Sequence, residues 1–542
     1  MKAKLFISFA TFVAANALMS SCSNDESTAT TTTDQLTAFT GGVVTEVPME
    51  RVQIGTSDSS TVVPGITTRT SMNREDIGGQ GVFLWEPNDV IYVVDDDNKL
   101  RKSLNTINES APRTTFLVDG SYTGKSEYDV YYCGTNSGVG EKKVVIADSQ
   151  FQLPFNNTKH FGGVGDCGVA KARKTTVQGK SVYRFDLEHK ASYLCFLPYI
   201  PSKLQRRHFK LIRIEITSDN NISGTYDLTQ AGLSGTGNSK TIVLNERFMG
   251  FDLEDAATKS IKNSLYVVIA PGTHALKVNY MLGEDRHFPV MITKSYKSHN
   301  FGANKIYDIP VNLGVRHYSG RNYYMWDAAE NYWSGHEWDA SVAWQPSVPY
   351  ESNDGYPKSK TADGARWYHE GIGSFEASVN PLFKELPNAN EIGWYVLKGD
   401  AHWDYTTGWE VFGDLLTGGI WLKKLSVIAQ ENNKKLAELK QADPKGKDLR
   451  ASSDFYYITP TYGKPSDSVI DKYFFLPALG WYDHGKLRNL GSNGYYWSSS
   501  SYNFGNTAID KSSQTCILFF HSGQVEMMGN NRYDGCVAQP LE

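Results

Sequence analysis

Short apolar runs with an alternating pattern dominate residues 35–313 and restrict this part of the chain to a β fold. Three isoleucines, Ile212, Ile214 and Ile216, alternate with polar side chains, which places them on one face of a predicted strand. Residues 276–280 (LKVNY) alternate in the same way. Turn-forming residues recur about every ten residues, and no convincing amphipathic helix interrupts them. The pattern predicts an all-β sandwich architecture.

Tryptophan is distributed unevenly along the chain. Of twelve tryptophans, only Trp85 precedes position 320, and the others run from Trp326 to Trp497. Such a change in composition marks a domain boundary, which we place near residues 316–321. A chain of 542 residues has room for about three domains, so the segment 316–542 is predicted to be a domain of its own.

The C-terminal segment mixes short aromatic strands with helical signals. A strand is predicted to begin within residues 418–422 (GGIWL), and residues 391–398 have the character of a short helix. Residues 426–442 carry apolar side chains at helical spacing and predict a surface helix that ends before Pro444 and Gly446. This region is therefore expected to be α+β.

The N-terminus has the pattern of a targeting segment. Lys2 and Lys4 precede a short apolar run at 5–15, which is too short to span a bilayer. Small residues before Cys22 resemble a bacterial lipobox, which implies a signal peptide over residues 1–21 and an acylated Cys22. The alternative is an ordinary cleaved signal peptide in which Cys22 has no role.

The residues after Cys22 favour the lipoprotein interpretation. The acidic stretch at 23–26 (SNDE) resembles the surface-export signal of Bacteroidetes lipoproteins. Threonines at 28–33 follow without periodicity, and residues 22–34 are predicted to be a disordered tether. No other run is long and apolar enough for a transmembrane helix, so attachment to the outer membrane would come from the lipid.

Net charge and cysteine content argue against a nucleic-acid-binding protein and against a disulfide-rich one. The net charge of −5 is mild, and no nucleic-acid surface is predicted. Besides Cys22 there are five cysteines, an odd number that argues against a complete disulfide framework. Cys516 and Cys536 lie in two late predicted strands and could pair in an oxidising compartment, or both could be free buried thiols. No metal-ligand spacing occurs.

A polar cluster surrounded by aromatic residues follows the predicted helix of the C-terminal segment. Its members are Asp400, His402, Trp403, Asp404, Tyr405, Trp409 and Glu410. The first interpretation is a well-packed loop held by its own hydrogen bonds. The second is a carbohydrate site with stacking rings and accepting carboxylates, and the third is a hydrolase acid and base. Because no catalytic motif occurs elsewhere, we predict no catalytic residue and no cofactor.

Six motifs occur in a fixed order within residues 35–315. They are 68–71 (TRTS), 82–85 (VFLW), 89–93 (DVIYV), 185–191 (FDLEHKA), 266–272 (YVVIAPG) and 302–309 (GANKIYDI). In this order they resemble the fimbrillin family of Bacteroidetes pilus subunits. The resemblance implies two tandem β-sandwich domains, at 35–170 and 171–315, with the join near Ala170.

The fimbrillin resemblance also implies a mechanism of assembly. Precursors reach the surface as lipoproteins, an Arg-specific protease releases the first strand, and a strand from another subunit fills the open groove by β-augmentation. Arg69 best matches the family's cleavage position, and Arg51 is second. The alternative is that Arg69 is a solvated loop residue in a chain that keeps its lipid.

Five motifs of the C-terminal segment carry a second resemblance. They are 386–391 (LPNANE), 399–404 (GDAHWD), 474–480 (FFLPALG), 494–500 (GYYWSSS) and 517–525 (ILFFHSGQV). Their order is similar to that of C-type-lectin-like domains of the Fibrobacter major paralogous type in Bacteroidetes surface proteins. Trp403 and Asp404 have no Glu-Pro-Asn or Gln-Pro-Asp partner at useful spacing, so calcium-dependent sugar binding is not predicted.

These patterns lead to one hypothesis and one alternative. About 230 residues follow the predicted strand at 306–313, which suits a subunit that caps one end of a filament. We expect a minor, tip-located fimbrial subunit at the cell surface that mediates adhesion and is not an enzyme. Its expected partners are other fimbrillin subunits through strand exchange, and a carbohydrate or a surface protein of a host or bacterium. The alternative is a surface-anchored glycan-binding lipoprotein outside any pilus.

Overall fold

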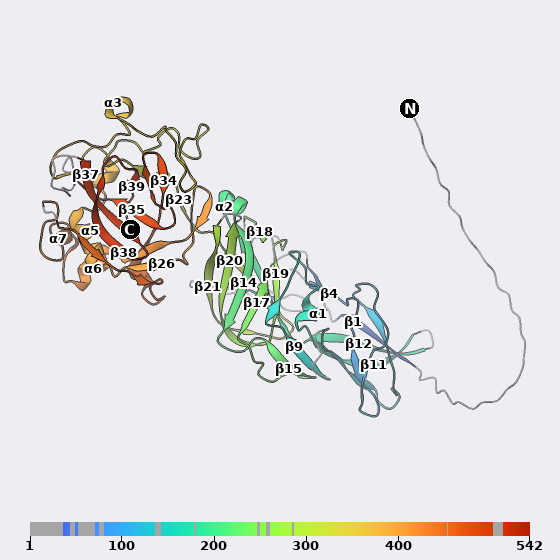
Figure 1. The fold of residues 1–542 in the computed structure, drawn as a ribbon. Helices are drawn as coiled ribbons and strands as arrows, with labels where there is room; N and C mark the ends of the chain where they lie inside the picture. The colour runs from blue at the N-terminus through green and yellow to red at the C-terminus, as the bar shows by residue number, and fades with distance from the viewer. Residues whose placement is uncertain are drawn as a thin grey trace, which may run out of the picture.

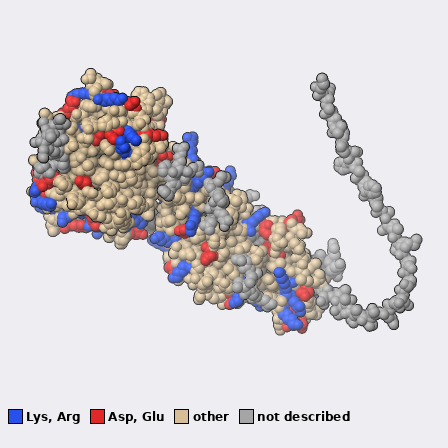
Figure 2. Space-filling model, viewed as in Figure 1, with Lys and Arg blue, Asp and Glu red and all other residues tan. Residues whose placement is uncertain are grey.

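The computed structural model is mainly β and elongated, with three units that follow one another in a row (Figure 1). The described residues are 36–43, 49–51, 71–74, 81–135, 142–177, 180–245, 250–255, 261–284, 287–451, 454–501 and 513–542. Positive and negative side chains are interspersed on the face shown in Figure 2. No helix among the described residues is both long and apolar enough to cross a membrane.

The first unit is built on a seven-stranded sheet with the order β6-β5-β8-β11-β12-β1-β7. Its strands are β1 (Thr37–Val43), β5 (Tyr92–Val94), β6 (Leu100–Lys102), β7 (Thr114–Val118), β8 (Glu127–Tyr132), β11 (Gly168–Val177) and β12 (Lys180–His189). One side packs on an aromatic core that includes Phe39, Trp85, Phe116 and Phe185. The lone early tryptophan is therefore a core residue.

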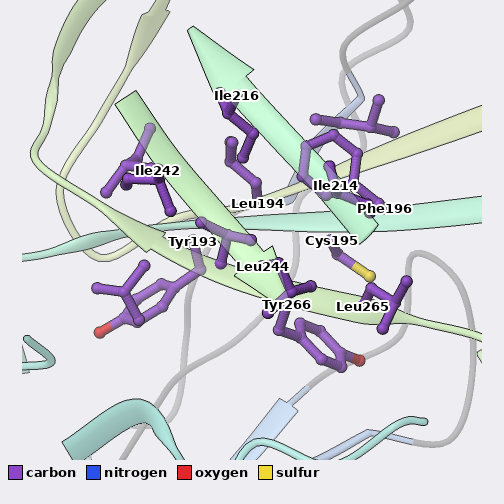
Figure 3. Packing of buried hydrophobic residues seen from close by; sticks show 14 of the residues in the cluster. Tyr193, Leu194, Cys195, Phe196, Ile214, Ile216, Ile242, Leu244, Leu265 and Tyr266 are labelled. Carbon is purple, nitrogen blue, oxygen red and sulfur yellow. The ribbon is translucent and has the colours of Figure 1, made fainter. Parts of the chain in front are cut away.

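The second unit is a β-sandwich. One sheet has the order β10-β17-β14-β20-β21 with β18 beside β14, and the other has the order β19-β13-β22-β2. The strands are β2 (Met49–Arg51), β10 (Ser149–Gln150), β13 (Ser192–Tyr199), β14 (Lys210–Ser218), β17 (Thr241–Asn245), β18 (Phe251–Asp252), β19 (Leu265–Ile269), β20 (Gly272–Glu284), β21 (His287–Phe301) and β22 (Ile306–Asn312). Figure 3 shows Leu194 and Phe196 of β13 packed near Ile214 and Ile216 of β14.

The join between these two units differs from the prediction. Ala170 lies in the middle of the first sheet, because β11 and β12 form one antiparallel hairpin with Gly168 opposite His189. The second sandwich begins with β13 at Ser192. The boundary is therefore at about residues 190–191, since a paired hairpin stays in one sheet.

Smaller elements connect the first two units. A three-stranded sheet contains β9 (Lys143–Ile146), β15 (Gly224–Thr229) and β16 (Gly232–Ser234), and β3 (Ser71–Arg74) pairs with β4 (Gly81–Leu84). The helices here are α1 (Phe161–Val164) and α2 (Lys203–His208). Strands β2, β9 and β10 precede β13 in the sequence but pair with strands of the second unit.

The predicted alternation of buried and exposed side chains is present in β20 and is interrupted in β14. Leu276, Val278 and Tyr280 of β20 are all buried. In β14, Ile214 and Ile216 are buried, but Ile212 is only half-buried. The cause is an irregularity in the pairing with β20 between Leu211 and Arg213, because a bulge moves one residue out of the two-residue period.

The C-terminal unit is α+β. Its main sheet has the order β24-β39-β35-β37-β38-β30, and a second sheet has the order β31-β26-β29-β32. The main sheet contains β24 (Tyr323–Tyr324), β30 (Tyr456–Ile458), β35 (Asn493–Trp497), β37 (Gln514–His521), β38 (Gln524–Asn531) and β39 (Cys536–Val537). The second contains β26 (His402–Asp404), β29 (Gly419–Lys423), β31 (Thr461–Tyr462) and β32 (Tyr473–Pro477).

Short elements complete the C-terminal unit. The strands are β23 (Arg316–Tyr318), β25 (Phe375–Glu376), β27 (Trp409–Val411), β28 (Asp414–Leu416), β33 (Trp481–Asp483), β34 (Lys486–Arg488) and β36 (Ser500–Ser501). The helical elements are α3 (Lys360–Asp363), α4 (Pro381–Lys384), α5 (Ala389–Lys398), α6 (Leu425–Glu431), α7 (Leu436–Leu439) and η1 (Ile470–Lys472).

The two helix predictions for this unit had different outcomes. The short helix near 391–398 is present as α5, which begins two residues earlier because Asn388 and Glu391 form a capping box. The single helix predicted for 426–442 is wrong. Two short helices, α6 and α7, stand there, and Asn433 between them has a φ of 54°. A left-handed residue ends an α-helix, and asparagine adopts this conformation more readily than most residues.

Candidate functional site

Asp404 lies at the end of β26 and is fully buried. Its Oδ1 accepts hydrogen bonds from the backbone N–H and hydroxyl of Thr406, and its Oδ2 accepts from the Trp421 indole N–H at 2.9 Å. Thr407 donates to both oxygens. Burial opposes ionisation, but these donors prevail and lower the pKa of Asp404. The carboxylate therefore holds its own loop.

The two tryptophans of the predicted cluster are core residues. Trp403 and Trp409 are 1% and 0% exposed. The Trp409 indole N–H donates to the Gly418 carbonyl oxygen at 3.0 Å, and Trp403 packs against Phe520. Neither ring offers a face to a ligand.

Asp400 and His402 are nearer to the surface, but they point to neighbours within the fold. The Tyr473 hydroxyl donates to Asp400 Oδ2 at 2.6 Å, and the Lys423 ammonium lies 3.6 Å from the same oxygen. His402 Nδ1 lies 3.2 Å from the Gly463 carbonyl oxygen. Burial opposes the effect, yet the hydrogen bond and the nearby lysine lower the pKa of Asp400.

Glu410, the remaining acid of the cluster, is also buried. Its Oε1 accepts from the Gly413 N–H at 2.8 Å, and its Oε2 lies 2.5 Å from His317 Nδ1. Trp403, Asp404, Trp409 and Glu410 are therefore packed inside the fold, whereas Asp400 and Tyr405 are exposed. The possible ligand-binding role of Asp400, His402, Trp403, Asp404 and Trp409 stays a prediction.

Cys516 and Cys536 are free and fully buried in the structure. Cys516 lies on β37 and Cys536 on β39, and β35 runs between these strands. Two strand spacings amount to about 9–10 Å, whereas a disulfide requires Cα atoms within about 7 Å. The possible disulfide is therefore corrected to two separate thiols, and burial raises the pKa of both thiols.

A pocket elsewhere in the C-terminal unit has the character of a ligand site. It measures about 300 Å³, and its lining consists of Met325, Tyr332, Tyr356, Pro357, Lys358, Trp367, His484 and Tyr533. This volume is at the lower end of the range for small-molecule sites. The residues come from four separate segments, so sequence spacing could not reveal them. The only signal was the enrichment of aromatic residues after position 320.

His484 is held in the pocket by the β33–β34 hairpin. Its φ is 46° and that of Gly485 is 75°, the signs required by a two-residue type I′ turn, in which asparagine is preferred at the first position. The imidazole Nδ1 lies 2.6 Å from Asp483 Oδ1, and the Arg488 guanidinium donates to Asp483 Oδ2 at 2.7 Å. Although burial opposes it, these two partners lower the pKa of Asp483.

Asp534 lies directly beside the pocket residue Tyr533. It is 1% exposed, and its Oδ2 accepts from the Asn530 side-chain amide at 3.1 Å. Burial, together with the nearby charge of Asp483, raises the pKa of Asp534 to about 8. Among the described residues, no group of three His, Cys, Asp or Glu side chains could hold a metal ion.

The strands nearest to the N-terminus form a second candidate site. Strand β1 lies inside the first sheet, parallel to β12 and antiparallel to β7. Strand β2, which ends at Arg51, pairs with β22 at the edge of the second unit. Arg69 and Cys22 lie outside the described residues, so their predicted roles stay predictions.

Comparison with solved structures gave distant likenesses. No family model and no curated protein matches the chain. A candidate cell adhesion protein from Bacteroides fragilis is 11% identical, with 52% of this chain and 94% of that chain covered and a TM-score of 0.27. A fimbrial protein from Bacteroides ovatus is 11% identical, with coverages of 84% and 95% and a TM-score of 0.23.

A third structure, the fimbrial anchor protein Mfa2 from Porphyromonas gingivalis, is also 11% identical. It covers 46% of this chain and 78% of its own length, with a TM-score of 0.19. At these identities and scores, the likenesses say nothing about the activity of the present chain.

Proposed function

We propose that this chain is a fimbrial subunit of the cell surface that mediates adhesion and is assembled by exchange of its first strand. The observation that carries the proposal is the place of β1 between β7 and β12. Both candidate cleavage residues, Arg51 and Arg69, follow β1 in the sequence. A cut at either residue would free β1 and β2 from the rest of the chain.

Loss of β1 would leave a slot with two open edges. Strands β7 and β12 would each lose a ladder of hydrogen bonds, and the aromatic core would lose Phe39, which is fully buried. A strand from another subunit could restore both ladders, as in β-augmentation. Filling the Phe39 position would contribute about 1.5–3 kcal/mol of hydrophobic free energy, besides the restored pairing.

The slot is also selective for a small residue at one position. A Cβ atom added at Gly41 would lie 2.7 Å from the Phe185 ring, whereas the group nearest to Gly42 is the end of the flexible, half-exposed Arg113 side chain, which can move away. A donor strand should therefore carry a large apolar residue at the Phe39 position and glycine two positions later. This requirement supports a specific donor over nonspecific strand pairing.

Strand β3 is fastened so that it would remain after such a cut. The Arg74 guanidinium forms two hydrogen bonds with the Asp308 carboxylate of β22, at 2.7 and 2.6 Å, and both side chains are buried. Thr158 adds a hydrogen bond to the Met72 carbonyl oxygen at 3.1 Å. The exchange would thus be confined to β1 and β2.

The C-terminal unit supports a position at the end of a filament. Strand β22 continues into this unit instead of ending free, and β39 lies inside the main sheet between β24 and β35. Both strands are paired on two sides and, unlike β1, would not be released by a cut at Arg51 or Arg69, so neither is available as a donor. A subunit that accepts a strand but donates none would cap one end of a filament. We propose that the C-terminal unit is C-type-lectin-like and forms the adhesive tip.

The alternative is a glycan-binding lipoprotein that stays anchored through Cys22 and never enters a filament. The aromatic pocket favours it equally, because the pocket does not depend on assembly. N-terminal sequencing of surface material separates the two. A start at Thr70 supports assembly, whereas an acylated Cys22 as the sole N-terminus supports the anchored protein.

The deciding variant is Arg69→Ala, with Arg173→Ala as a matched control at an exposed position of β11. We expect Arg69→Ala to accumulate as a longer, lipid-bearing form that is absent from filaments, while the control assembles normally. Entry of Arg69→Ala into filaments at the normal size would show that Arg69 is not the processing site.

Removal of residues 316–542 should reduce attachment to target cells, and unchanged attachment would refute the adhesive role.

A further inference from the structure

The aromatic pocket of the C-terminal unit has walls suited to one face of a flat, partly apolar ligand. Tyr356, Trp367 and Tyr533 are half-buried, so part of each ring remains accessible. The His484 ring bridges two of them, with centroids 6.1 Å from Tyr356 and 5.7 Å from Tyr533. Trp367 is steadied by a hydrogen bond from its indole N–H to Glu370 at 2.9 Å.

Two polar side chains of the pocket lining, Lys358 and His484, offer different hydrogen-bonding groups to a ligand. Lys358 supplies an ammonium donor. His484 directs Nδ1 to Asp483, so Nε2 is the ring nitrogen left for a ligand, and it accepts when Nδ1 alone carries the proton. A ligand that offers both hydroxyl donors and acceptors next to an apolar face would match this set.

The β33–β34 turn fixes the place of His484 beside the pocket. Its φ of 46° is left-handed, a conformation that histidine adopts more readily than most residues other than glycine, asparagine and aspartate. Asparagine would suit this turn better. The hairpin therefore keeps an imidazole where the backbone alone would favour another side chain.

We infer that this pocket binds one neutral pyranose residue of a glycan, with its apolar face on the aromatic rings and its hydroxyls on Lys358 and His484. The inference deepens the adhesive role proposed above and rests on it. It assigns the chemical class of the ligand and the residues that recognise it.

The charges around the pocket argue against a cationic ligand. The Lys358 ammonium lies 5.0 Å from the centre of the Tyr356 ring and occupies the place of a bound cation. The nearby carboxylates have partners already, since Asp483 faces His484 and Arg488, and Glu370 faces Trp367 and Lys360. An anionic sugar would have to compete with Asp354, whose carboxylate lies 3.6 Å from the Lys358 ammonium, so a neutral ring is favoured.

Saturation-transfer NMR on the full-length protein can test this inference. The probes are the methyl pyranosides of gluco, galacto, manno and N-acetylgluco configuration, with choline and N-acetylneuraminate as cationic and anionic comparisons. We expect at least one neutral pyranoside to bind with a millimolar dissociation constant. Preferential binding of choline or N-acetylneuraminate, or no binding of any neutral pyranoside, would overturn the inference.

Three variants locate the binding site. Trp367→Ala removes one wall, and His484→Asn removes the imidazole while it suits the turn. Each should weaken binding about tenfold. Tyr457→Ala is the control, because Tyr457 is 64% exposed on β30, at the sheet edge opposite β24. Unchanged binding in both pocket variants would place the ligand elsewhere.

The test of the ligand class and the test of adhesion can give different results. Attachment of cells by the intact protein, lost when residues 316–542 are removed, tests adhesion without any choice of ligand. A protein that attaches cells but binds no neutral pyranoside would refute the ligand class alone. A protein that binds a pyranoside but attaches no cells would refute adhesion and leave the pocket assignment standing.

Discussion

At the scale of single residues, two buried carboxylates of the C-terminal unit have pKa values that are shifted in opposite directions. Asp404 and Asp534 are both buried. Asp404 accepts hydrogen bonds from two hydroxyls and an indole N–H, and its pKa is lowered. Burial, together with the nearby charge of Asp483, raises the pKa of Asp534 to about 8. Burial raises the pKa in both cases, and the number of donors decides whether the net shift is downward.

Asp534 should make the stability of the C-terminal unit depend on pH. Its pKa is about 8 in the folded protein and about 3.9 in an unfolded chain, so the folded state binds this proton more tightly. The free energy of unfolding should therefore fall as pH rises from about 4 to about 8, by a few kcal/mol. Asp534→Asn should remove most of this loss and be more stable than the native protein above about pH 8.

Thermal melting followed by tryptophan fluorescence measures this effect, since eleven of the twelve tryptophans lie in the C-terminal unit. Asp354→Asn is the control, because the Asp354 side chain is fully exposed. An equal pH dependence in Asp534→Asn and the native protein would contradict the raised pKa.

At the scale of elements, β1 is shaped by its two neighbours more than by its own composition. Its sequence, TAFTGGV, contains two adjacent glycines, which weaken a strand in isolation. Gly41 is required because the Phe185 ring occupies the space where its side chain would stand, whereas Gly42 faces the flexible end of Arg113. A strand that is weak by itself but complementary to its slot is suited to exchange.

Gly41→Val should therefore destabilise the first unit although valine favours strands. The new side chain would collide with the Phe185 and Trp85 rings, 2.7 and 3.1 Å from its Cβ, and overpacking of this kind costs about 1–3 kcal/mol. Hydrogen exchange of the β7 and β12 amides would measure the loss of protection. Thr40→Val, on the half-exposed neighbour, is the control, and equal protection in both variants would refute the tight fit.

At the scale of the whole molecule, the second unit and the C-terminal unit share a small joint. Leu415 of β28 is 1% exposed and belongs to the hydrophobic core of the second unit. The Gln205 side chain of α2 donates to the Val315 carbonyl oxygen at 3.0 Å and accepts from its N–H at 3.2 Å. These contacts hold the C-terminal unit at the end of the row seen in Figure 1.

Leu415→Ala should loosen this joint without unfolding either unit. Deletion of a buried leucine side chain costs about 2–5 kcal/mol, and the loss would fall on the contact between β28 and α2. Hydrogen exchange should become faster in α2 and in residues 409–416, while β14 and β37 keep their protection. Leu436→Ala, at a position 50% exposed, should change neither. Global loss of protection in Leu415→Ala would show that the two units fold as one.

Features that depend on local pattern could be predicted from the order of amino acids alone. Alternating side chains predicted a mainly β chain, the change in tryptophan content predicted a separate unit from about residue 316, and the pattern of residues 391–398 predicted the helix seen as α5. Strand and helix periods are properties of consecutive residues, and composition depends only on the order of residues along the chain.

Features that depend on residues far apart in the sequence became visible in the folded chain. The pairing of β11 with β12 moved the join of the first two units, and β35 separated Cys516 from Cys536. The folded chain turned Trp403 and Asp404 inward and brought Tyr356, Trp367, His484 and Tyr533 around one pocket. Such contacts arise from sheet order and packing between distant segments, and no short stretch of sequence contains that information.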